Sequence, residues 1–269
     1  MHHQLVRAFV VVAVGLLAPA PSGAGPATPQ GNPAELFAAA LAERDGSLRL
    51  TRLEAVVSAA PGNLRYSAAY RQELLKRKEY DRGIAFFTRL ASAHPKDPHV
   101  ALSYGYAYVD KLPDASFFSH LGLANKALAE FSRAVQLGPS WLTLYSRGNL
   151  NVYFPRMLGR TKNGIADLEK ARELVRGETR RSYHALTWAA LGDGHWRLGD
   201  TPRAREIWRE GLALFPGDAR LLARANKSDR DLDRYLGDLL TPGVRVSTDL
   251  VEVYREGWQE ACSCPPDGE

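Results

Sequence analysis

The sequence predicts an all-α protein built from repeated helix pairs, and three observations support this prediction. Pro61 and Pro95 each end an apolar-periodic stretch and lie 34 residues apart, which is a spacing typical of helix–turn–helix repeats. Pro139 and Pro216 follow two further stretches of the same kind, and a proline at such a position cannot continue a helix. No stretch shows the alternation of apolar and polar residues between hairpin turns that indicates strands.

The composition is that of a folded globular protein. The chain has 269 residues, of which 45% are hydrophobic and 24% charged, which is enough apolar material for a sizeable core. The formal net charge is +5, and basic residues are interspersed with acidic ones, as in "DRDLDR" at 229–234. Because no block of Lys and Arg occurs, we expect no nucleic-acid partner.

Residues 1–24 have the layout of a secretory signal peptide. Arg7 precedes an apolar run from Ala8 to Leu17, and a small-x-small cleavage pattern ends at Ala24. The run is shorter than the roughly 20 residues that a transmembrane helix needs. We therefore expect a periplasmic or secreted protein without a stable membrane span after cleavage, and an uncleaved N-terminal anchor is the alternative. Residues 25–32 are expected to form a flexible linker.

The clearest repeat is residues 185–218, "ALTWAALGDGHWRLGDTPRAREIWREGLALFPGD". Small residues in it allow two antiparallel helices to approach closely, and large apolar ones fill the remaining volume. This unit resembles a tetratricopeptide repeat (TPR) over its whole length. The positions that carry the resemblance are Trp188, Leu191, Gly192, Ala204, Trp208, Gly211 and Pro216, whereas His195 replaces the usual aromatic residue.

Less complete copies of the pattern lie on both sides of this repeat. The resemblance implies three other repeats, at 64–97, 98–139 and 141–178, preceded by a degenerate unit at 33–61. Residues 219–240 are expected to form one polar-faced capping helix, because a terminal repeat has no neighbour to cover its apolar face. The implied fold over residues 33–240 is therefore a right-handed TPR solenoid with a C-terminal cap and a tail.

Two inter-helix turns are longer than the family period requires. Residues 113–122 add about ten residues and residues 153–162 add about four. These insertions carry apolar side chains, namely Phe117, Phe118, Phe154 and Met157. They either pack against their own repeats or form an exposed patch that contacts a partner.

The tail, residues 241–269, lies outside the repeats. Ser247 or Thr248 is expected to cap a short helix with one apolar face, formed by Leu250, Val253, Tyr254 and Trp258. This helix either folds back onto the last repeats or serves as a partner-binding or exchanged element.

Both cysteines of the chain, Cys262 and Cys264, lie near its end. They can form a strained disulfide, bind a soft metal ion or be unremarkable tail residues, although two ligands do not complete a metal site.

We expect no catalysis, cofactor or metal. No phosphate-binding glycine loop, zinc-protease, haem-attachment or nucleophile-elbow motif occurs. His184 and His195 lie on roughly the same helix face, but two histidines alone do not make a metal site. We interpret His195 as a core substitute for tyrosine.

The resemblance implies a concave groove lined by positions of the first helices that packing does not use. In this chain these are Tyr106, Tyr145, Asn149, Tyr153, Asp193, Trp196 and Arg197. Because Tyr, Trp and Arg dominate interface hot spots, the sequence predicts a non-catalytic adaptor that binds a peptide or protein there. The alternatives are a small-ligand-binding accessory protein of an envelope transport system and a redox or metal-delivery role of Cys262 and Cys264.

Overall fold

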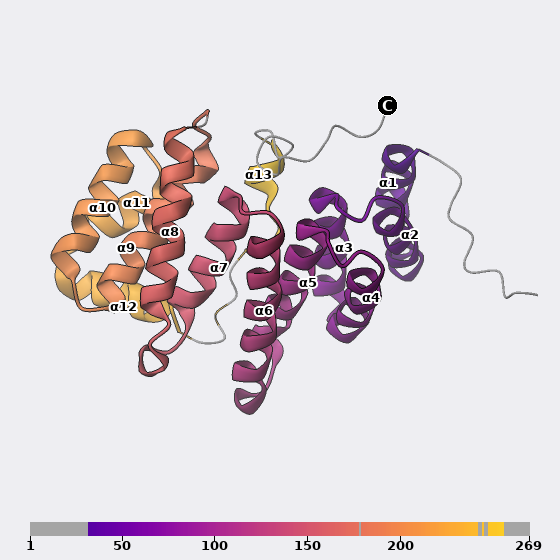
Figure 1. Cartoon of the computed structure of the whole chain (residues 1–269), viewed down its shortest axis with the longest axis horizontal. Coiled ribbons are helices and arrows are strands. Elements are labelled where there is room, and N and C mark those ends of the chain that lie inside the picture. The colour runs from indigo at the N-terminus through magenta and orange to yellow at the C-terminus, as the bar shows by residue number, and fades with distance from the viewer. Residues whose placement is uncertain (1–31, 178, 242–243, 245–246, 256–269) are drawn as a thin grey trace, which may run out of the picture.

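The computed structural model describes residues 32–177, 179–241, 244 and 247–255. Within these residues the regular structure is entirely helical, as predicted (Figure 1). The signal-peptide and linker predictions for 1–24 and 25–31, together with Trp258, Cys262 and Cys264, lie outside the described residues, as do the side chains of Phe117 and Tyr254.

Helices follow one another in antiparallel pairs along the long axis of the molecule (Figure 1). The pairs match the predicted repeats and include the degenerate first unit. They are α1 (Pro33–Ala42) with α2 (Gly46–Ala59), α3 (Leu64–Arg77) with α4 (Tyr80–Ala93), α5 (Pro98–Lys111) with α6 (Phe117–Leu137), α7 (Trp141–Tyr153) with α8 (Thr161–Arg176), and α9 (Ala185–Arg197) with α10 (Thr201–Leu214). They are followed by α11 (Ala219–Ala225), α12 (Asp229–Leu239) and α13 (Val251–Arg255).

Short polar side chains set where many of these helices begin. Asn63 accepts a hydrogen bond from the Tyr66 backbone N–H, and Asp97 accepts from two backbone N–H groups of α5. Asp200 accepts from the Arg203 backbone N–H at the start of α10. Such caps satisfy donors that the first turn of a helix leaves unpaired.

The 185–218 repeat has the predicted packing. Trp188, Leu191, Ala204 and Trp208 are buried. Gly192 lies so close to the Trp208 indole that a Cβ atom would clash with it, and a Cβ on Gly211 would come within 2.8 Å of Trp188 Cβ. Glycine at these two positions therefore permits the close approach of α9 and α10. Pro216 follows α10 and is exposed.

The structure corrects two predicted boundaries. Residues 113–122 are not simply a long turn, because α6 begins at Phe117 and runs for 21 residues. Its first turns project beyond the neighbouring helices (Figure 1). Gly122 is the main helix-disfavouring residue there and costs only about 1 kcal/mol, which the rest of a long apolar-periodic helix outweighs.

The predicted single cap at 219–240 is two helices, α11 and α12. They are separated at residues 226–228, because Ser228 uses its hydroxyl to cap α12 by accepting from the Asp231 backbone N–H. A side chain that competes for backbone groups in this way favours a helix start over a helix interior.

Candidate binding site

A cavity of about 580 Å³ lies where α5 and α7 face the returning end of the chain. α3 packs against α5 and α7 against α9, whereas the backbones of α5 and α7 make little contact with each other. Residues 247–253, here called the C-terminal strap, also line the cavity. Both insertions also contribute to its lining, through residues 113, 118, 120 and 121 and residues 153–155, 157 and 158.

Thr248 anchors the strap to the N-terminal half of the molecule. Its backbone carbonyl accepts a hydrogen bond of 2.7 Å from the Arg71 guanidinium of α3, and its hydroxyl donates to Asp110 of α5. Arg71 and Asp110 are themselves an ion pair, with 2.7 Å between Nη1 and Oδ2. All three residues are buried, and Thr248 is only 4% exposed. The strap therefore supplies polar partners to a buried charge pair whose desolvation is costly.

A second anchor connects the strap to the C-terminal half. Glu252 forms an ion pair of 2.9 Å with Arg220 of α11, and Val253 is buried in the same apolar cluster as Trp141 and Tyr183. Asp249 accepts from the Val251 backbone N–H and so caps α13 in place of the predicted Ser247 or Thr248. The described part of the tail thus folds back onto the solenoid, and it contacts α3 and α5 as well as α11.

Four of the predicted groove residues, Tyr106, Tyr145, Asn149 and Tyr153, line this cavity together. The Tyr106 hydroxyl lies 2.7 Å from the Ser146 hydroxyl, which joins α5 to α7. Tyr145 stacks on Trp141 with 5.3 Å between ring centroids. Burial raises the pKa of Tyr145 and of Tyr153, so both are neutral phenols at physiological pH.

Asp193 does not line the cavity, and its prediction as a groove residue is corrected. It is 4% exposed, and both carboxylate oxygens pair with the Arg224 guanidinium, at 2.6 and 2.7 Å. The reason is that α11 packs against α9 and covers this position.

Trp196 and Arg197 also lie outside the residues that line the cavity. The Trp196 indole N–H donates to Asp233 of α12 at 2.8 Å. Arg197 donates to the carbonyls of Phe154 and Leu240, and burial lowers the pKa of its guanidinium. These two side chains therefore connect α9 to the turn after α7 and to the cap, rather than facing the open groove.

The insertions resolve into one packed and two exposed apolar side chains. Phe154 is buried, whereas Phe118 is 92% and Met157 is 90% exposed. Because Phe118 and Met157 also line the cavity, they lie at its open side. For these two residues the structure agrees with the alternative in which the insertions form an exposed apolar patch.

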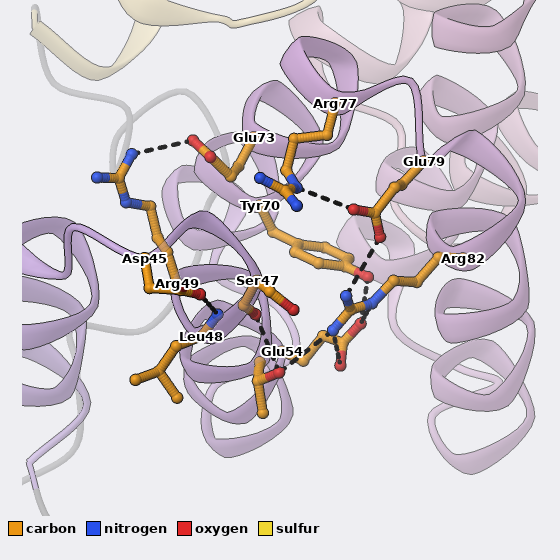
Figure 2. A network of polar contacts seen from close by, with 11 residues as sticks. Asp45, Ser47, Leu48, Arg49, Glu54, Tyr70, Glu73, Arg77, Glu79 and Arg82 are labelled. Atoms are coloured by element: carbon orange, nitrogen blue, oxygen red, sulfur yellow. Dashed lines mark hydrogen bonds and ion pairs between the residues drawn. The ribbon is translucent and has the colours of Figure 1, made fainter.

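A separate polar network joins α2, α3 and α4 (Figure 2). The Tyr70 hydroxyl donates to Glu54 at 2.6 Å, and the same carboxylate accepts from Arg82 at 2.8 Å. Arg82 and Arg77 both pair with Glu79. Burial, and then the hydrogen bond to Glu54, raises the pKa of Tyr70, so its phenol is no nucleophile at neutral pH. We interpret this network as structural.

The histidines give no indication of chemistry. His184 is buried beside Trp141 and Tyr183, and burial lowers the pKa of the half-buried His195. In the part of the chain that the structure describes, no group of three His, Cys, Asp or Glu residues is placed to hold a metal ion. No helix there combines the length and apolarity needed to cross a bilayer.

Comparisons with known proteins agree with this architecture. A thermophilic TPR protein of Thermus thermophilus superposes with a TM-score of 0.51 at 19% identity, over 78% of this chain and 98% of that one. A tetratricopeptide repeat protein from Parabacteroides merdae gives 0.52 at 16% identity, over 83% of this chain and 79% of that one. The chain has the tetratricopeptide-repeat fold. The tetratricopeptide repeat family model matches residues 185–228, which include the clearest TPR unit and the start of the cap. A search of curated proteins finds no match.

Proposed function

We propose that this TPR protein is a non-catalytic scaffold, exported to the periplasm or outside the cell, that binds a short segment of a partner protein where α3, α5 and α11 hold the strap. The observation that carries the proposal is the strap, whose residues 247–250 are non-helical and whose residues 251–253 begin α13, and which is held by side chains of α3, α5 and α11. Helical solenoids use extended concave surfaces for binding. Export rests on the signal-peptide pattern of residues 1–24.

The strap contacts define the chemistry that a partner segment must offer. Arg71 accommodates a backbone carbonyl, Asp110 a hydroxyl, and Arg220 a carboxylate. In the strap the last two groups belong to Thr248 and Glu252, which are four residues apart, with an apolar residue after each of them in Leu250 and Val253. We therefore expect a partner segment with Ser or Thr, an acidic residue four positions later and apolar residues at the same offsets. Such a segment replaces the strap.

The experiment is a peptide-binding assay with the full-length protein. A labelled peptide with the sequence of residues 244–255 is titrated by fluorescence anisotropy against wild type and against Thr248→Val, which weakens the protein's own strap. Because the tethered strap competes at a high effective concentration, the variant should bind the peptide at least about tenfold more tightly than wild type. Thr51→Val, on the exposed side of α2, is the matched control and should behave as wild type.

The specificity of binding is tested with altered peptides. Replacing Thr by Val and Glu by Ala in the peptide should remove its contacts to Asp110 and Arg220 and weaken its binding to Thr248→Val. If the altered peptide binds as tightly as the original, or neither binds, the strap position is not a segment-binding site. Export is tested separately by mass spectrometry of the mature protein, which should begin at Gly25, whereas an uncleaved anchor leaves Met1 in place or removes only that residue.

A further inference from the structure

We propose that the cavity beneath the C-terminal strap binds an uncharged, mainly apolar small molecule while the strap is in place. This goes beyond the scaffold role, because it assigns a ligand to the strapped form of the protein rather than a partner that replaces the strap.

The volume of the cavity is the first argument. The cavity of about 580 Å³ between α5, α7 and the strap is open to solvent at Phe118 and Met157, and its volume falls within the range of small-molecule sites. Strap residues line this space without filling it, so the bound strap does not account for the volume.

The chemistry of the lining is the second argument. Apolar side chains from helices and strap predominate, including Val109, Phe131, Leu150, Leu186, Leu250 and Val253. Tyr145, Asn149 and Tyr153 add uncharged side chains with the capacity to donate and accept hydrogen bonds, and burial keeps the two tyrosine phenols neutral. A few polar groups on an apolar wall are the usual means of orienting a mainly apolar ligand.

The charged residues of the lining argue against an ionic ligand. Asp110 is paired with Arg71 and accepts from Thr248, and Arg220 is paired with both Asp218 and Glu252. An anionic ligand would have to break the ion pairs of Arg220 and would lie near the carboxylates of the strap. A cationic ligand would have to compete with Arg71 for Asp110, or with the Val251 backbone N–H for Asp249. An uncharged molecule needs neither exchange.

The two insertions account for the open side of the site. Phe118 and Leu121 come from the projecting start of α6, and Met157 and Leu158 come from the turn between α7 and α8. All four are exposed and line the cavity. Apolar side chains at the mouth remove further water from an apolar ligand, which is a role for the insertions that the helix repeat itself does not need.

The test compares two naphthalene dyes on the full-length protein. N-phenyl-1-naphthylamine is uncharged, and anilinonaphthalene sulfonate is a similarly sized anion. Fluorescence titration should show saturable binding of one uncharged dye per chain and clearly weaker binding of the anion. Ala124→Phe, on the lining of the cavity, fills space in it, so it should weaken binding of the uncharged dye at least about tenfold. Ala129→Phe, on the exposed side of the same helix, is the matched control and should bind as wild type.

Several outcomes overturn the proposal. Equal binding by Ala124→Phe and Ala129→Phe places the dye on the surface, and equal affinity for the two dyes contradicts the charge argument. Loss of dye binding as the protein self-associates in sedimentation experiments means that a second copy fills the cavity. If Ala124→Phe fails to fold by circular dichroism, Leu186→Trp provides the same filling from α9. The peptide assay above is independent, so failure here leaves the scaffold proposal intact.

Discussion

Replacing Trp188 and Trp208 by Phe in turn separates the packing of a buried indole from the hydrogen bonding of its N–H group. Trp188 is 1% exposed and Trp208 is fully buried, so both substitutions remove a similar amount of packed ring. The Trp208 N–H donates to the Ala189 carbonyl at 3.2 Å, whereas the Trp188 N–H is buried without an acceptor. We expect Trp188→Phe to destabilise the protein much less than Trp208→Phe.

The magnitude follows from the two N–H groups. Phe buries up to roughly 50 Å² less than Trp, which costs about 1–1.5 kcal/mol in either case. Trp208→Phe also loses a hydrogen bond worth about 1 kcal/mol, while Trp188→Phe removes an unsatisfied donor that costs about 1–3 kcal/mol. The free energy of unfolding should therefore fall by about 2–4 kcal/mol more for Trp208→Phe. Trp188→Ala leaves a large cavity and should cost about 3–5 kcal/mol.

The assay is urea unfolding followed by far-ultraviolet circular dichroism, which is insensitive to the loss of one fluorophore. Trp188 and Trp208 lie in the paired helices α9 and α10, so both report the same transition even if the solenoid does not unfold as one unit. Equal costs for the two Phe variants would refute the hydrogen-bond argument. A cost under about 1 kcal/mol for Trp188→Ala would show that Trp188 is not a core residue.

Other substitutions test the remaining buried polar groups. Asp193→Ala should cost about 3–5 kcal/mol in urea unfolding because it leaves the Arg224 charge buried, and replacing both residues by Leu should recover most of this; equal losses for the single and double variants would contradict it. Burial lowers the pKa of His195, so its stabilising contribution is present above about pH 6.5 and is lost as the pH falls; in His195→Tyr the melting temperature should depend less on pH in that range. Burial raises the pKa of Tyr145 and Tyr153, so their contribution is present below about pH 10 and is lost at higher pH. The double Phe variant should retain more stability there, and an unchanged alkaline melting curve would argue against this assignment.

Local patterns were enough to predict the helix pairs. A proline after an apolar-periodic stretch ends a helix whatever lies around it, and Gly192 opposite Trp208 indicates close packing between neighbours in sequence. The groove positions on α5 and α7 came instead from the TPR resemblance, which implies that first-helix positions not used in packing line a groove. The predicted helix boundaries were wrong at the start of α6 and at Ser228. At both places a helix and a turn are close in free energy, so the local pattern does not decide between them.

The sequence by itself determined the repeat architecture and the packing of the 185–218 unit, because these depend on contacts between residues close along the chain. Four residues of the cavity wall followed from the resemblance to TPR proteins. Only the tertiary structure decided where the tail lies and what Asp193 contacts. Thr248 accepts a hydrogen bond from Arg71, which is 177 positions away in the sequence, and Asp193 of α9 pairs with Arg224 of α11. Such pairings depend on the rotation between successive repeats, which sets how distant helices lie relative to one another, and on which buried charges need a partner. A local sequence pattern indicates neither of these.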